Sequence, residues 1–233
     1  MRTQPTKRCS THGATAGSYD GACLPVRSLY LGRMSDLVKT APAALALDSR
    51  AGWPADLRLL IDRYPRDCWT GHANLGAMAQ FWLQRHDMFR EIAAALSEAT
   101  EAFRGGTASA QDFRAWFPPR LQFFLQQLNA HHQIEDLHYF PVFQAAEARL
   151  AHGFEVLEAD HGAIHHSIER TVETANAFLR AAVNDADVLR TSGDAYMAAS
   201  GTLLRQLGQH LGDEEDLIVP LILDRTEAGL GVG

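Results

Sequence analysis

Four segments of this 233-residue chain carry apolar side chains at spacings of three or four residues, which is the period of an amphipathic helix. No stretch of useful length alternates with the period of two that marks a half-buried strand. The sequence therefore predicts an all-α protein, and the fairly short links between the segments favour an up-down-up-down four-helix bundle. The four expected helices cover approximately residues 69–100, 120–150, 154–183 and 194–223.

The part of the chain before these segments has a different character. Residues 1–33 are rich in Gly, Ser, Thr, Ala and Arg without periodicity, and the next residues are weakly patterned, so residues 1–52 are expected to form a disordered extension. Met34 opens the more ordinary sequence and is a candidate for the true start of the protein. A short extra helix is expected from Pro54 to about residue 64, and the bundle domain is expected to span residues 53–226.

Composition limits the partners and the compartment. The formal net charge is −7, and beyond residue 33 the chain carries 16 basic against 27 acidic residues. Such an acidic body argues against nucleic acid and anionic membranes as partners and suits a domain that holds cations. Three scattered cysteines are too few for a disulfide framework, no apolar run reaches transmembrane length, and the N-terminus lacks the apolar stretch of a secretory signal. A cytoplasmic protein is therefore expected.

Histidine interrupts each of the four apolar stripes. His86 lies on the first segment, His131 on the second, His161 and His165 on the third, and His210 on the fourth. With a rise of about 1.5 Å per residue, these positions fall near one level of an antiparallel bundle. A layer of imidazoles inside an apolar core is costly unless the rings are paired, and bound metal ions would remove that cost.

One motif occurs twice, on the second and the fourth segments. Both copies read His, Glu four residues later, a further acidic residue at five and Pro at ten; the pairs are His131 with Glu135 and His210 with Glu214. Residues at i and i+4 lie on one face of a helix, one turn apart. A single pair of this kind is typical of a solvated helix surface. Two copies, with a His-x-x-x-His on the segment between them, favour a metal site instead.

These residues resemble the motifs of the hemerythrin-like (HHE) cation-binding proteins, over about residues 69–225. The resemblance implies a four-helix bundle with two non-haem iron ions, bridged by two carboxylates and by an oxo or hydroxo group. The histidines of the third and fourth segments would bind one iron, those of the first and second the other. Zinc and manganese suit the same ligand types. Carried over position by position, the implied ligands are His86, His131, Glu135, His161, His165, His210 and Glu214.

Departures from the family pattern leave several positions open. Glu215 is an alternative to Glu214, because some members place this carboxylate five residues after the histidine, although the internal repeat favours Glu214. His132 points about 100° away from the stripe and is expected on the flank, as a supporting or surface residue. His138 is nearly in line with the stripe, yet the second copy of the motif has Leu there. His72 stands too far along its helix to reach the same site.

The leading interpretation is a non-enzymatic di-iron protein for sensing, scavenging or carrying a diatomic ligand. The resemblance implies that dioxygen or nitric oxide binds at a vacant position on one iron. A dry, apolar pocket favours reversible capture of a small neutral molecule over its reduction. The residues expected to line that pocket are Trp82, Phe89, Leu128, Ile164, Leu207 and Leu217.

Two other classes of function stay open. A ferritin-like oxidase needs Glu-x-x-His on each of two helices, and this chain has one such motif, from Glu135 to His138. A peroxide-consuming iron enzyme belongs to the same alternative. Iron storage or delivery is the other alternative, for which Cys9 and Cys23 are the only supporting feature. A shell rich in histidine favours ligand binding over the carboxylate-rich chemistry of oxidases.

Overall fold

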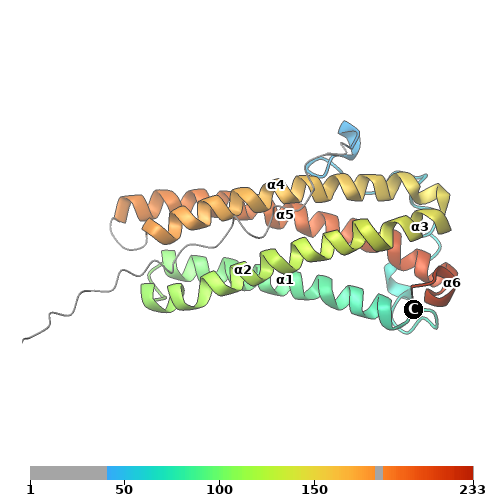
Figure 1. Ribbon diagram of the computed structural model, residues 1–233, viewed down its shortest axis with the longest axis horizontal. Coiled ribbons are helices and arrows are strands. Elements are labelled where there is room, and N and C mark those ends of the chain that lie inside the picture. The colour runs from blue at the N-terminus through green and yellow to red at the C-terminus, as the bar shows by residue number, and fades with distance from the viewer. Residues whose placement is uncertain (1–40, 182–185, 233) are drawn as a thin grey trace, which may run out of the picture.

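The computed structural model describes residues 41–181 and 186–232, and every regular element in these ranges is helical. This confirms the predicted all-α class. Four long helices lie side by side along the longest axis of the molecule, so the described chain forms a helical bundle (Figure 1). They are α1 (Ala77–Arg104), α2 (Ala110–Ile134), α4 (Ala151–Ala181) and α5 (Ala186–Arg225). The short helices are α3 (Phe140–Ala146) and α6 (Glu227–Leu230).

The prediction for the start of α2 was wrong. The helix begins at Ala110 and runs through Pro118 and Pro119, which the sequence placed in a connection. An interior proline costs roughly 3 kcal/mol because it removes a hydrogen bond and crowds the preceding turn. Here the helical path buries Phe113 and Phe117, one turn apart, in the core. Burial of these aromatic rings outweighs the local preference of the prolines.

The expected second helix is also divided further along. After Ile134 the backbone forms a single π-helical turn, η4 (Glu135–Tyr139), followed by α3 and by a 3₁₀ turn at Ala148–Leu150. Pro141 occupies the first turn of α3, where a proline is tolerated because its missing N–H has no partner in the helix. The regular part of α2 thus ends at Ile134, ahead of Pro141, which lies inside the following helix. π-turns inside helices are frequent at functional sites.

In the N-terminal part of the chain, the structure describes only the residues from 41 onward, and these pack on the bundle. Residues 1–40, including Met34, lie outside the described residues. Residues 41–52, expected to be disordered, are described, and two of their side chains are buried. Leu47 belongs to the main apolar cluster, and Arg50 pairs with acidic residues of α4 and α5. Ordered structure therefore begins before the boundary expected at residue 53.

The short helix expected from Pro54 is a series of turns instead. An isolated segment of this length has little helical stability of its own, so packing decides its shape. Leu57 and Leu60 are buried against the bundle as their apolar character requires. Gly153 of α4 makes room for this packing: a Cβ there would lie 2.7 Å from Cδ1 of Leu217 and 3.5 Å from the methyl carbons of Leu57.

Two apolar clusters fill the bundle, and a layer of buried polar side chains separates them. One cluster lies toward the α1–α2 link and the other toward α3 and α6. On α1 the change from one cluster to the other falls at His86, between Trp82 and Phe89. On α4 it falls at His161, between Leu157 and Ile164. On α5 it falls at Glu214, between Leu211 and Leu217. All six side chains expected to line a pocket are buried.

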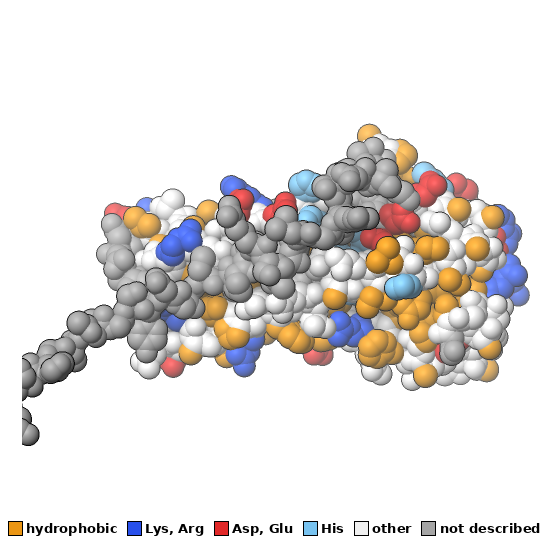
Figure 2. Space-filling view, viewed as in Figure 1, with side chains coloured by type: hydrophobic (Ala, Val, Ile, Leu, Met, Phe, Trp, Pro, Cys, Tyr) orange, Lys and Arg blue, Asp and Glu red, His pale blue; other side chains and the backbone are white. Residues whose placement is uncertain are grey.

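The surface mixes charge with apolar side chains. On the face shown in Figure 2, Lys and Arg side chains are interspersed with Asp and Glu side chains rather than gathered into one field. Within the described ranges, no helix combines the length and the apolar character that crossing a membrane requires.

Candidate metal centre

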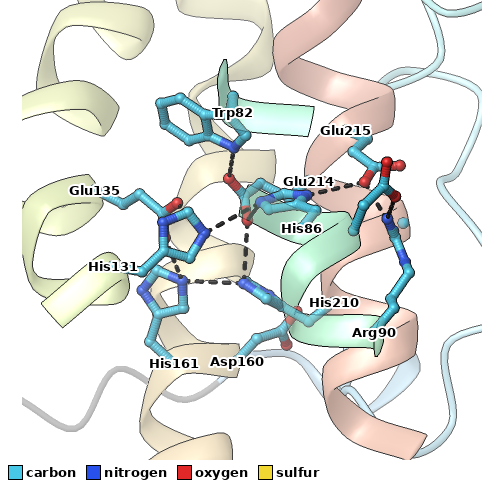
Figure 3. A network of polar contacts seen from close by, with 12 residues as sticks. Trp82, His86, Arg90, His131, Glu135, Asp160, His161, His210, Glu214 and Glu215 are labelled. Atoms are coloured by element: carbon cyan, nitrogen blue, oxygen red, sulfur yellow. Dashed lines mark hydrogen bonds and ion pairs between the residues drawn. The ribbon is translucent and has the colours of Figure 1, made fainter. Parts of the chain in front are cut away.

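Six of the residues expected as ligands, four histidines and two glutamates, converge in the polar layer, and each of the four long helices contributes to the group (Figure 3). Five of these residues are at most 1% exposed, and the side chain of the sixth, His131, is 10% exposed. The structure thus brings together six of the seven residues that the sequence singled out. They are His86 on α1, His131 on α2, Glu135 at the start of η4, His161 on α4, and His210 and Glu214 on α5.

The four rings form two close pairs. The Nε2 atoms of His86 and His131 lie 3.1 Å apart, and so do those of His161 and His210. Two nitrogens bound to one metal ion at about 2.1 Å, and separated by nearly a right angle, would lie roughly 3 Å apart. The spacing of each pair therefore suits two ligands of one ion.

Both glutamates reach both pairs of rings. Oε1 of Glu135 lies 2.8 Å from Nε2 of the α2 histidine, and its Oε2 lies 3.5 Å from Nε2 of the α4 histidine. Oε2 of Glu214 lies 3.7 Å and 3.3 Å from Nε2 of the α1 and α5 histidines. Both oxygens of Glu135 and Oε2 of Glu214 are buried without a hydrogen-bond partner among the described residues. Buried polar atoms rarely stay unpaired, and a shared cation between the ring pairs would satisfy all three.

The electrostatics of the group also favour a bound cation. Burial, followed by the nearby Glu214 carboxylate, raises the pKa of Glu135 well above its usual range. Burial would also raise the pKa of Glu214, but the neighbouring imidazoles of His86 and His210 outweigh it and lower that pKa. Burial lowers the pKa of His131 to about 3, against the pull of Glu214, so this ring is neutral with a lone pair to offer. Burial would lower the pKa of His210, but its hydrogen bonds to Asp160 and Glu214 raise it to about 9. A metal ion bound to this ring would displace its proton and would stabilise the carboxylates.

Carboxylates orient three of the four histidines from behind. A carboxylate that accepts the Nδ1–H hydrogen bond fixes the tautomer in which the Nε2 lone pair faces the centre, as behind many metal-bound histidines. The Nδ1-to-oxygen distances are 2.7 Å from His161 to Asp136, 2.9 Å from His86 to Glu215 and 3.5 Å from His210 to Asp160. Trp82 orients Glu214 in the same manner, because its Nε1–H donates to Oε1 of this glutamate at 2.7 Å.

The two adjacent glutamates Glu214 and Glu215 make different contacts. Glu214 faces the ring pairs, whereas Oε1 of Glu215 lies next to His86 and accepts a hydrogen bond from Arg90 at 2.7 Å. Oε2 of Glu215 accepts from Arg66 at 2.8 Å. The hydrogen bonds from His86 and the two arginines outweigh burial and lower the pKa of Glu215 to about 2. Glu215 therefore supports the centre from outside it.

Comparison with known families gives an independent result. The model of the hemerythrin HHE cation-binding domain matches residues 77–222, which is more than half of the chain and extends from the first residue of α1 into the last turns of α5. The chain belongs to this family. Searches of curated proteins and of solved structures found no significant match. Family membership and the His/Glu clusters together make this a hemerythrin-like cation-binding domain with residues that could hold metal.

His132 lies at the centre, although the sequence placed it on the flank. It is 4% exposed, its ring stacks on that of His161 with centroids 4.0 Å apart, and its Nε2 has no hydrogen-bond partner in the described part of the chain. One of its nitrogens lies within 4.8 Å of ligand atoms of His161, His210 and Glu135. A bundle helix has two neighbours, so positions about 100° apart can both face the interior. That argument could have found His132 from the sequence.

The structure does not bring His165 to either four-residue group. Its side chain is 20% exposed, and Nε2 lies 3.5 Å from Oε1 of Glu169, one turn further along α4. His138 is exposed, because the π-turn adds a residue to the helical turn and rotates this position away from the stripe. His72 caps a turn, with its Nδ1 accepting from the backbone N–H of Asn74 at 3.1 Å. The exclusion of His72 from the centre therefore agrees with the structure.

Proposed function

We propose that this hemerythrin-like domain is a non-haem di-iron protein that binds a small diatomic ligand, dioxygen or nitric oxide, without turning over a substrate. His86 and His131 would hold one iron, His161 and His210 the other, and the two glutamates would bridge them. When bound, two such irons supply redox-active sites at which a small neutral ligand can bind. The observation that carries the proposal is the pair of 3.1 Å Nε2 contacts with unpaired carboxylate oxygens between them.

The proposal includes the alternating, up-down-up-down direction of the four long helices. In that order α1 lies next to α2 and α4 next to α5, and these two pairs make the closest helix contacts of the described chain. A histidine near the middle of each helix then falls at one height, whichever end of the bundle the helix starts from. The alternation would thus place one histidine pair between α1 and α2 and the other between α4 and α5.

The surroundings of the centre favour binding over catalysis. The rings of Trp82 and Phe89 lie 6.0 Å and 5.2 Å from that of His131, centroid to centroid, and Phe140 lies 5.5 Å from His161. These aromatic side chains exclude water and withhold protons from a bound ligand. On α5, the position that would complete a second Glu-x-x-His motif is the buried Leu217. The arrangement therefore lacks the ligand pattern of the ferritin-like oxidases.

The proposal predicts two irons per chain and a stable ligand complex. Protein purified under anaerobic conditions should contain iron in preference to zinc and manganese, and its optical spectrum should change on exposure to air or to nitric oxide. The spectrum formed in air should persist for as long as oxygen is present. Metal analysis with optical spectroscopy tests both points. Rapid decay of the new spectrum with consumption of peroxide or an organic reductant would support the oxidase or peroxidase alternative, and zinc occupancy would contradict the proposal.

The placement of His132 and His165 predicts opposite behaviour of two alanine variants. His132→Ala is expected to weaken metal binding at the His161 and His210 side by about 10-fold or more, because it removes a buried ring at the centre. His165→Ala should bind as the wild type does. His166→Ala is the matched control, since this side chain is exposed and hydrogen-bonds to the backbone carbonyl of Gly162 in its own helix.

Titration of the metal-free variants against a competing chelator gives the affinities. Loss of metal from His165→Ala, with full binding by His132→Ala, would restore the ligand set that the family resemblance implied.

A further inference from the structure

Two arginines stand behind the metal centre, and both come from the chain segment that precedes the family-matched region. Arg50 and Arg66 each precede a tryptophan by three residues, in the sequences Arg-Ala-Gly-Trp and Arg-Asp-Cys-Trp. Each guanidinium lies over its own tryptophan ring, at 4.9 Å for Trp53 and 4.8 Å for Trp69. The ring and the charge thus form a rigid unit. Both units belong to residues 41–69, the strap.

The first unit holds the carboxylate behind His210. The side chain of Arg50 is completely buried, and its Nη1 and Nη2 donate to the two oxygens of Asp160 at 3.3 Å and 2.5 Å. Oδ2 of this carboxylate lies 3.5 Å from Nδ1 of His210. Nε of Arg50 also donates to Asp213 at 2.8 Å, and Trp53 donates its indole N–H to the backbone carbonyl of the same residue at 2.9 Å.

The second unit holds the carboxylate behind His86. Nη1 of Arg66 donates to Oε2 of Glu215 at 2.8 Å, while Oε1 of this carboxylate lies 2.9 Å from Nδ1 of His86. Nε of Arg66 donates to Asp216 at 2.8 Å and its Nη2 donates to the backbone carbonyl of Gly212 at 2.7 Å. The first unit therefore binds α5 at Asp213, and the second binds it at Gly212, Glu215 and Asp216. These positions lie before and after Glu214 along the helix.

We propose that the strap is a built-in part of the metal centre and that Arg50 and Arg66 are positioning residues, one for a histidine of each metal ion. The inference rests on the proposed function. An arginine that shares a carboxylate with a histidine fixes the carboxylate in place and weakens it as a hydrogen-bond acceptor. The ring of the histidine is then held in a single orientation, with its Nε2 facing the metal position. The strap would thereby set the affinity and the reduction potential of both irons from outside the bundle.

The two arginines should act on different metal ions. Arg66→Ala is expected to weaken the binding step at the His86 side by about 10-fold, the low end of the range for residues behind metal-bound histidines. Arg50→Ala should do the same for the His210 side. Arg50→Lys keeps the charge but loses the planar guanidinium. Its affinity for iron at the His210 side should therefore lie between those of Arg50→Ala and the wild type. Arg63→Ala is the matched control, because this 65% exposed residue of the strap pairs with Asp224, outside the centre.

The test is an anaerobic titration of each metal-free full-length variant with ferrous iron against a chelator, followed by measurement of the reduction potential. Arg66 is 47% exposed, so we expect Arg66→Ala to fold, and this variant keeps the test decisive even where Arg50→Ala does not fold. Weaker iron binding and a shifted potential in Arg66→Ala, with a wild-type result for Arg63→Ala, would support the inference.

Two outcomes would overturn it, and they differ from each other. Two irons bound with wild-type affinity and potential in both Arg50→Ala and Arg66→Ala would remove the positioning role and leave the proposed function standing. A wild-type protein that binds no iron would remove the proposed function, and the inference with it.

Discussion

Removal of the metal is expected to lower the melting temperature of the protein by about 8–16 °C. A ligand present at about 1,000 times its dissociation constant stabilises the folded state by about 4 kcal/mol, and each kcal/mol shifts the melting temperature of a 150–250-residue domain by about 2–4 °C. The structural cause is local. Without a cation, three buried carboxylate oxygens of Glu135 and Glu214 have no hydrogen-bond partner among the described residues. Thermal unfolding followed by circular dichroism, with and without a chelator, measures the shift.

The control for this experiment is a variant that lacks a ligand of one of the two ions. His210→Ala removes one nitrogen of the second ring pair, so its melting temperature should respond to the chelator less than that of the wild type. The exposed His166→Ala should respond as the wild type does. Superimposable wild-type curves, with metal removal verified by elemental analysis, would show that the centre makes no contribution to stability.

Arg50→Ala is expected to destabilise the metal-free protein by about 3–5 kcal/mol. That is the usual cost of breaking a buried ion pair on one side only, because the partner charge is left in the interior. Asp160 is 1% exposed and Asp213 is 5% exposed, so both carboxylates would lose their arginine while staying out of water. Urea unfolding of the metal-free variant, compared with the metal-free wild type, gives the free-energy difference.

A second substitution distinguishes the stranded charge from lost packing. Adding Asp160→Asn to Arg50→Ala removes one of the stranded charges, so part of the lost stability should return. Arg63→Ala, which breaks an exposed pair, should change stability by less than about 1 kcal/mol. Equal stability of Arg50→Ala and the wild type would show that the ion pairs of Arg50 with Asp160 and Asp213 do not hold residues 41–52 to the bundle.

Helical periodicity alone predicts which of the candidate ligands share a helix face. His131 with Glu135 and His210 with Glu214 are one helical turn apart, so any helix that contains them presents both side chains on one face. The apolar residues around them show which face is buried. These two facts, with the family resemblance, selected seven residues, and the structure brings six of them to one layer and leaves His165 outside it.

Local backbone preferences mispredict the start of α2, because tertiary packing overrides them. Pro118 and Pro119 argue for a connection on backbone grounds. The helix passes through them because Phe113 and Phe117 are buried in the core. Their rings contact Phe178 of α4 and Tyr196 of α5, at 5.7 Å and 5.4 Å between centroids. No count of propensities contains these contacts, since they require the other helices to be in place.

The sequence by itself determined the helical class, the family and the residues that share a buried face. Only the tertiary structure decided which neighbour each face meets. That choice places His132 in the centre and leaves His165 outside it, sets Glu214 inside and Glu215 behind, and lays Arg50 across two helices. The physical reason is the separation along the chain of the residues that interact. Helical periodicity relates residues within one or two turns of each other. The partners of a buried charge, by contrast, stand more than a hundred residues away along the chain, as Arg50 stands from Asp160.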